Sequence, residues 1–257
     1  MRDPLTGVLH TYRQRRTLRR WERLAEVAQE TSIQNLREIR NMARQVRQRL
    51  STVSHIAEAR LSLPTSGSAA SALPFGTDWA GRPVAWSGPV DPSGHAPARS
   101  ETSMGDDDTL YHDCRQQTVS LRQMRNTRDE DLAPYGLVLE VYGFDGTFLS
   151  LVFRAAPDGV AGITRNHLLR LDLEIEAERP LTAYARLNIK AGPNNEQVTR
   201  QVPLSGTQAH CEFDLAYLSF RDQKVDQVWI DLFIEDPAMT RIQIRDVILS
   251  RRLRAET

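Results

Sequence analysis

The sequence predicts a mainly β protein, an antiparallel β-sandwich of jelly-roll type preceded by a long N-terminal α-helical arm and a flexible linker. Near the N-terminus, apolar residues recur every three or four positions, as on one face of a helix. A Pro-, Gly- and Ser-rich stretch without any period follows. From Leu110 onward, apolar and polar residues alternate in short runs. The predicted domains are a basic helical, coiled-coil-like arm (1–62), a linker (63–108) and a β-sandwich (109–257).

The arm consists largely of strong helix formers, with no Gly after Gly7 and no Pro between Pro4 and Pro64. Its apolar residues predict a coiled coil and a homo-oligomer, because they repeat in heptads. Their register shifts near Thr31, which indicates a stutter or a break there. The heptad seam, as we call this row, consists of Leu36, Ile39, Ala43, Val46, Leu50, Val53 and Ala57.

The arm is strongly basic although the whole chain has a formal charge of zero. It holds thirteen arginines, no lysine and six acidic residues, a formal charge of +7. Arginine favours anionic partners such as phosphate, an acidic lipid surface or an acidic protein surface. The alternative is the solvated exterior of a coiled coil, and nucleic acid is not expected because the β-domain shows no basic face. The candidate anion-binding residues are Arg13, Arg15, Arg16, Arg19, Arg20 and Arg23.

The linker contains two tryptophans, Trp79 and Trp86, which are unusual in a flexible segment. Large aromatic side chains normally bury their surface against something. We therefore expect Phe75 to Trp86 to pack against the folded domain.

The β-domain has nine candidate strands separated by turn signals. Asp145-Gly146 predicts a two-residue hairpin, and Ala191 to Asn195 predicts a longer hairpin loop. No helical pattern intervenes, so the strands predict a sandwich. They are Thr118 to Met124, Gly136 to Phe144, Thr147 to Arg154, His167 to Ala177, Leu181 to Lys190, Glu196 to Leu204, Cys211 to Leu218, Lys224 to Glu235 and Arg241 to Ser250.

The alternation assigns one row of each strand to the core and the other to the outer sheet face. On two strands the outer rows combine aromatic and polar side chains, which together suit the C–H faces and hydroxyls of a sugar. The alternatives are an ordinary solvated sheet face or a face covered by the linker tryptophans. The candidate ligand-binding residues are Tyr184, Arg186, Asn188, Trp229 and Asp231.

Several segments resemble an uncharacterised family of Rhodobacterales proteins, among them Tyr184 to Val198, Val228 to Phe233 and Ile244 to Arg251. The closing strands are similar to those of galactose-binding-like or carbohydrate-binding-module jelly rolls. The resemblance implies lineage and fold but no activity. Sugar-binding members of that fold use aromatic and polar side chains on a concave sheet face or at one end of the sandwich.

No catalytic residue, metal site or cofactor is predicted. His112, Cys114, His210 and Cys211 are zinc-ligand types, but His210 and Cys211 are neighbours and point to opposite faces of a strand. The glycosidase pairs Glu174 with Glu176 and Asp231 with Glu235 are better explained as outer-face acids. Asp106 to Asp108 could supply calcium ligands but fit a solvated linker end.

The sequence thus predicts a non-enzymatic binding or adaptor protein, whose sandwich recognises a glycan or a protein surface and whose arm oligomerises or anchors it. A structural or scaffolding protein without a small-molecule site is the alternative, and a polysaccharide hydrolase the third hypothesis. No apolar segment resembles a signal peptide or a membrane span, and there are only two cysteines. We therefore expect a cytoplasmic protein, free or at the cytosolic face of a membrane.

Overall fold

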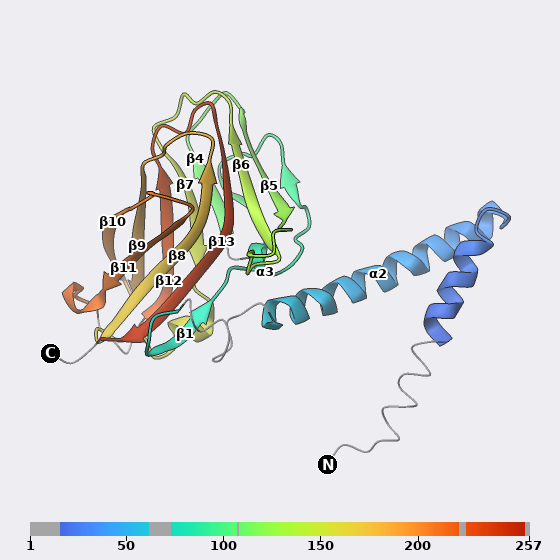
Figure 1. Cartoon of the computed structure of the whole chain (residues 1–257), viewed down its shortest axis with the longest axis horizontal. Helices are drawn as coiled ribbons and strands as arrows, with labels where there is room; N and C mark the ends of the chain where they lie inside the picture. The colour runs from blue at the N-terminus through green and yellow to red at the C-terminus, as the bar shows by residue number, and fades with distance from the viewer. Residues whose placement is uncertain (1–15, 62–72, 107, 221–224, 255–257) are drawn as a thin grey trace, which may run out of the picture. The chain divides into compact units, whose positions relative to one another are not determined.

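The computed structural model describes residues 16–61, 73–106, 108–220 and 225–254. The chain divides into two units, Met1–Val53 and Ser54–Thr257. The first is helical where it is described, and the second is a mainly β structure (Figure 1).

The helical unit contains two helices where one long arm is predicted. Residues 16–26 form the first, residues 27–32 form a turn, and α2 spans Ile33–Leu61. Ser32 caps α2, because its Oγ accepts a hydrogen bond from the N–H of Asn35 at 3.4 Å. The described part of the arm is therefore two helices and not one continuous helix, and the break falls at the register change predicted near Thr31. Residues 1–15 lie outside the described part.

The described strands form two antiparallel sheets that pack face to face (Figure 1). One sheet, which we call the β13 sheet, has the order β11-β8-β13-β6-β5-β2, and β1 pairs with the last part of β13. Its strands are β1 (Thr77–Gly81), β2 (Gly94–His95), β5 (Val119–Arg125), β6 (Tyr135–Val141), β8 (His167–Ala177), β11 (Gln208–Asp214) and β13 (Thr240–Leu253).

The other sheet, which we call the β12 sheet, has the order β10-β9-β12-β7-β4-β3. Short helical segments, α3 (Val84–Ser87), α4 (Pro157–Val160) and η1 (Leu215–Tyr217), join strands of the sandwich. The strands of this sheet are β3 (Thr102–Ser103), β4 (Asp108–His112), β7 (Leu149–Arg154), β9 (Ala183–Ala191), β10 (Asn194–Val202) and β12 (Val225–Ile234).

The nine strands predicted from the alternation are all present, with ends shifted by a few residues. The hairpin at Asp145-Gly146 is wrong, because β6 and β7 belong to different sheets. Here the Asp145 carboxylate accepts a hydrogen bond from the N–H of Arg115 at 2.8 Å and holds a crossover loop. The loop between β9 and β10 is tighter than predicted, since Ala191 pairs directly with Asn194.

The core lies between the two sheets and uses the predicted apolar rows. Leu171, Leu187 and Leu232, one from each of β8, β9 and β12, are completely buried. In β13 the pairing register shifts between Ile244 and Asp246, which marks a β-bulge. The bulge explains why Val247 is buried three positions after Ile244, where strict alternation would expose it.

The predicted linker, 63–108, is wrong for its described second part, which belongs to the sandwich. Trp86 is completely buried, stands edge-on to Phe153 at 5.6 Å between ring centroids, and donates from Nε1 to the carbonyl of Ile244 at 2.9 Å. Trp79 also packs against the core, whereas Phe75 is fully exposed. The expected docking of Phe75 to Trp86 is therefore confirmed for both tryptophans but not for Phe75.

Candidate functional site

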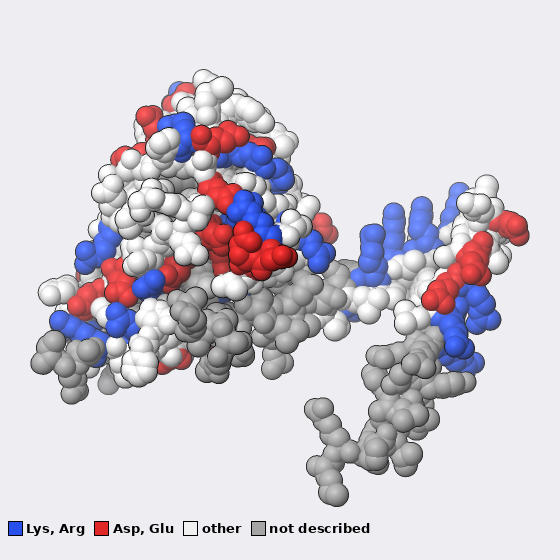
Figure 2. All heavy atoms as spheres, viewed as in Figure 1, with Lys and Arg blue, Asp and Glu red and all other residues white. Residues whose placement is uncertain are grey.

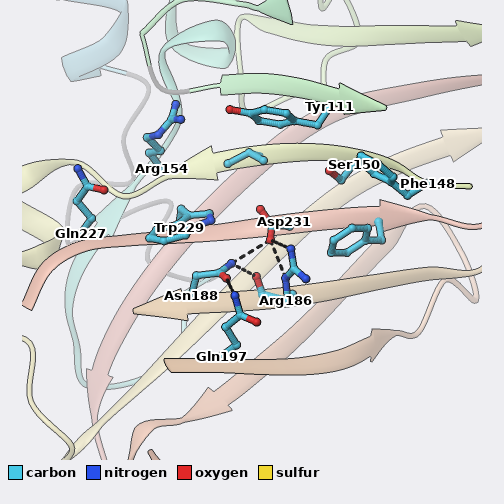
Figure 3. A pocket seen from close by; sticks show the side chains of 12 residues that line it. Tyr111, Phe148, Ser150, Arg154, Arg186, Asn188, Gln197, Gln227, Trp229 and Asp231 are labelled. Atoms are coloured by element: carbon cyan, nitrogen blue, oxygen red, sulfur yellow. Dashed lines mark hydrogen bonds and ion pairs between the residues drawn. The ribbon is translucent and has the colours of Figure 1, made fainter. Parts of the chain in front are cut away.

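The two polar rows predicted as a ligand site lie on adjacent strands. In the pairing of β9 with β12, Trp229 stands opposite Asn188, Asp231 opposite Arg186, and Phe233 opposite Tyr184. All of these side chains except that of Tyr184 line a cavity of about 400 Å³ on the outer face of the β12 sheet (Figure 3). The full lining is Tyr111, Phe148, Ser150, Val152, Arg154, Arg186, Asn188, Gln197, Gln227, Trp229, Asp231 and Phe233.

A hydrogen-bonded chain across β10, β9 and β12 fixes the polar floor of this cavity. Oδ2 of Asp231 accepts from Arg186 Nε at 2.8 Å, from Arg186 Nη2 at 2.7 Å and from Asn188 Nδ2 at 3.0 Å. Asn188 Oδ1 in turn accepts from Gln197 Nε2 at 2.9 Å (Figure 3). Among the described residues, the hydrogen bonds of the Asp231 carboxylate all fall on Oδ2, which leaves Oδ1 as an acceptor for a ligand.

Aromatic rings flank the polar chain. The guanidinium of Arg186 lies over the ring of Phe233, with Cζ 4.6 Å from the centroid, so one side chain is held by both an ion pair and a cation–π contact. Trp229 and Tyr111 are partly exposed at the cavity. Neither ring donates or accepts a side-chain hydrogen bond within the described residues, so both remain available to a ligand.

A second cavity of about 510 Å³ continues the first along the strands. The two share Phe148, Arg186 and Phe233 in their linings. Tyr184, which we predicted as a member of the site, lines only this second cavity. We call the two cavities together the groove; both volumes fall in the range of small-molecule sites, about 300–1,000 Å³.

Sequence reasoning missed the part of the groove contributed by β4, β7 and β10. Tyr111 pairs with Ser150, Arg154 pairs with Trp229, and Gln197 pairs with Asn188. The alternation of these strands gives their outward positions, but nothing local indicates which strands are neighbours. Neither linker tryptophan lines the groove.

The histidines and cysteines considered as zinc ligands in the sequence do not form a metal site in the described structure. Both ring nitrogens of His112 are bonded, Nε2 to the carbonyl of Ala98 at 3.1 Å and Nδ1 to the N–H of Cys114 at 3.2 Å. Burial raises the pKa of the Cys211 thiol to about 12. Within the described residues, no three His, Cys, Asp or Glu side chains are arranged to hold a metal ion.

The Glu174 and Glu176 carboxylates lie on β8 in the other sheet. The pKa of Glu174 is raised, mainly by burial and then by the nearby charges of Asp131 and Asp246. The pKa of Glu176 is lowered, mainly by its hydrogen bonds with Arg128. Because β8 belongs to the β13 sheet, neither acid lines the groove. The other predicted pair is divided between the two cavities, since Asp231 lines only the first and Glu235 only the second.

The described arginines of the predicted anion-binding cluster, Arg16, Arg19, Arg20 and Arg23, are exposed on the first helix. Arg13 and Arg15 lie outside the described residues. Figure 2 shows that basic side chains recur along both helices. None of the described helices is long and apolar enough to cross a membrane.

The fold and the groove together define a β-sandwich protein with an open, aromatic-flanked polar site on one sheet. Over residues 1–257 the chain matches a family of unknown function, DUF6478, and it belongs to that family. This agrees with the predicted resemblance to an uncharacterised family, while the Rhodobacterales lineage stays a prediction. No curated protein sequence matches the chain significantly.

Several solved structures are similar in part. The enzymatically active domain of tailspike protein 4 from bacteriophage CBA120 is 13% identical with a TM-score of 0.41, over 60% of this chain and 21% of that chain. The family 11 carbohydrate-binding module of a Clostridium thermocellum cellulosomal cellulase is 10% identical with a TM-score of 0.38, over 62% and 95%. An exo-β-agarase is 10% identical with a TM-score of 0.39, over 61% and 25%. Such distant similarity carries no argument about a ligand of this chain.

Proposed function

We propose that the sandwich is a non-catalytic module that binds a polysaccharide chain in the groove, and that the helical unit brings several copies together or anchors them. One observation carries the proposal: a fixed polar chain, Gln197–Asn188–Asp231–Arg186, lies in a cavity flanked by exposed aromatic rings. Sugar hydroxyls need oriented donors and acceptors, and sugar C–H faces pack on apolar rings.

The length of the groove favours a chain over a single sugar. Gln227 lines one cavity and Glu235 the other, both from the region of β12. They are eight positions apart, which corresponds to about 26 Å at a rise of about 3.3 Å per residue. An extended ligand would therefore contact both cavities at once.

Binding without hydrolysis is favoured by the carboxylates. A glycosidase requires two carboxyl groups on either side of the bond that is cleaved. Asp231 is the only acidic residue among the described residues that line the first cavity, and its Oδ2 is already paired with Arg186; the second cavity adds Glu235 and Asp236. Glu235 is four positions beyond Asp231, about 13 Å at a rise of about 3.3 Å per residue, which exceeds the roughly 5–9.5 Å between the carboxyl groups of a glycosidase. Reducing-end assays on any bound polysaccharide should show no release of new ends; their appearance would favour the hydrolase hypothesis.

The binding experiment is affinity electrophoresis and calorimetry of the full chain with a panel of soluble polysaccharides. We expect Trp229→Ala to weaken binding at least tenfold, because it removes the ring beside the polar chain. The matched control is Tyr217→Ala, an exposed ring in η1 that lines neither cavity. Equal affinities of the two variants, or no binding of any saccharide by the wild type, would contradict the proposal.

The scaffolding alternative keeps no specific observation in its favour, since the linker tryptophans do not line the groove. The role of the helical unit rests on its exposed heptad-seam residues Leu50 and Val53 and on its exposed arginines. A glycan partner, oligomerisation, contact with an anionic membrane and a cytoplasmic location are all parts of this proposal.

A further inference from the structure

Two arginines line the first cavity, and they differ in their partners. Arg186 is neutralised by Asp231. Arg154, the last residue of β7, is exposed, and no carboxylate among the described residues lies within ion-pair distance of it. Its one hydrogen bond in the described part runs from Nη1 to Thr109 Oγ1 at 3.4 Å, which is long. Within the described residues, the other N–H groups of this guanidinium at the edge of the cavity have no hydrogen-bond partner.

The position of Arg154 relates it to the aromatic part of the groove. It pairs directly with Trp229 across β7 and β12. Figure 3 shows Arg154 and Gln227 toward one end of the cavity, with Trp229 between them and the Arg186–Asp231 pair. A sugar ring that packs on Trp229 would therefore place its substituents within reach of the guanidinium.

The charge of the lining points to an anionic group at this end. With Arg154, Arg186 and Asp231 as the charged members of its lining, the first cavity carries a formal charge of +1, whereas Glu235 and Asp236 make the lining of the second cavity acidic. A guanidinium forms its strongest hydrogen bonds with oxyanions, and it can hold a carboxylate through two parallel N–H bonds. Neutral hydroxyls would leave the charge of Arg154 without a counterpart.

We propose that the groove binds an acidic polysaccharide, with an oxyanion of one sugar held by Arg154 while its ring packs on Trp229. The oxyanion is a uronate carboxylate or a sulfate ester, which share this chemistry. This inference rests on the proposed function and adds the class of glycan.

The experiment compares short oligosaccharides in pairs that differ only in charge. The full chain is titrated calorimetrically with oligouronates of several linkages, each beside its neutral methyl ester, and with sulfated oligosaccharides beside their desulfated counterparts. The variants are Arg154→Gln and the control Arg125→Gln, which removes an exposed arginine from β5 in the other sheet. The control is needed because the basic helical unit attracts any polyanion to both variants equally.

We expect at least one acidic oligosaccharide to bind tenfold or more tightly than its neutral partner. This preference, the ratio of the two affinities, should shrink as NaCl is raised and should fall about tenfold in Arg154→Gln but not in Arg125→Gln. Carboxylate and sulfate pairs identify which oxyanion is used.

Two results would overturn the inference separately from the proposed function. If acidic and neutral oligosaccharides bind equally, the groove binds glycans without an ion pair to Arg154. The same conclusion follows if Arg154→Gln and Arg125→Gln change the preference for the acidic oligosaccharide by the same factor. If no saccharide of either kind binds, the proposed function fails and the acidic class fails with it.

Discussion

Asp231 and Asn188 illustrate how single residues prepare the groove for a ligand. Both are buried, Asn188 almost completely, although they lie on the outer face of a sheet. Burial of such groups is tolerated because each is hydrogen-bonded to its neighbours. A site whose polar groups are already fixed loses little side-chain freedom on binding. The alternation placed both residues on the outer face, but their mutual bonds depend on a strand pairing that no local pattern contains.

Glu174 on β8 provides a pH-dependent test of the electrostatics at residue scale. Its pKa is raised above the ordinary 4.5, first by burial and then by Asp131 and Asp246. Slightly above pH 4.5, the folded protein therefore binds this proton more tightly than the unfolded chain does. The stability that the protonated group contributes is fully present below the unfolded pKa and is lost as the pH rises through the folded pKa. Glu174→Gln should raise Tm at pH 7.5, and this gain should vanish below about pH 4, as measured by scanning calorimetry.

Glu176, two positions along the same strand, provides a control because its pKa shift has the opposite sign. Its pKa is lowered, mainly by Arg128, so its contribution is present above the unfolded pKa and lost as pH falls. Glu176→Gln should lower Tm at pH 7.5 and have little effect at low pH. Equal shifts in both variants at pH 7.5 would mean that burial does not govern Glu174.

At the scale of elements, the segment from β1 to β3 shows why composition misled the sequence analysis. Its strands are two to five residues long, too short to display any period, and Pro83, Pro89, Pro92 and Pro97 lie between them. The segment is held by a few anchors instead. Arg82 donates to both oxygens of Asp246 at 2.7 and 2.8 Å, and Trp86 enters the core. The tryptophans were the only local signal of this packing, since Asp246 is far away in the sequence.

Trp86 should therefore contribute strongly to stability, as a core residue and not as part of a linker. Trp86→Ala should cost about 3–5 kcal/mol, because it leaves a cavity beside Phe153 and removes the bond to the Ile244 carbonyl. Phe75→Ala, at a fully exposed position, should change stability by less than about 0.5 kcal/mol. Guanidinium unfolding followed by far-UV circular dichroism measures both, and similar midpoints would restore the linker interpretation.

At the scale of the whole molecule, the fold class was predictable and the site was only half predictable, for one reason. Periodicity is local, and it gave nine strands and their inward faces. The groove joins β4, β7, β12 and the hairpin of β9 and β10, and long stretches of chain separate these parts. Most of its polar floor lies on β9 and β12, whose outer rows are unusual, so this part was predicted from the sequence, whereas Gln197 on β10 was not. Tyr111 and Arg154 lie on strands with ordinary outer rows, and only the sheet order brings them to the site.

The helical unit is likewise known only from a local pattern: its heptad seam predicts that a second copy of the chain packs against it. In α2, Leu50 and Val53 are 61% and 64% exposed, so these two seam residues are not covered by any part of the chain that the structure describes. We expect the full chain to have at least twice the monomer mass in light scattering at tens of micromolar. Leu50→Asp should yield monomers, because it places a charge in the seam, whereas Asn41→Asp, an exposed position off the seam, should not.

Self-association would also change how the groove acts. Joined copies bind a polymer through several sites at once, so avidity can exceed the affinity of one groove by about 10²–10⁴. Leu50→Asp should therefore weaken binding to a long polysaccharide but leave the affinity for a short oligosaccharide unchanged, as calorimetry and affinity electrophoresis can compare. A monomeric wild type would rule out the coiled coil, and an equal loss for short and long ligands would show that the variant damages the groove itself.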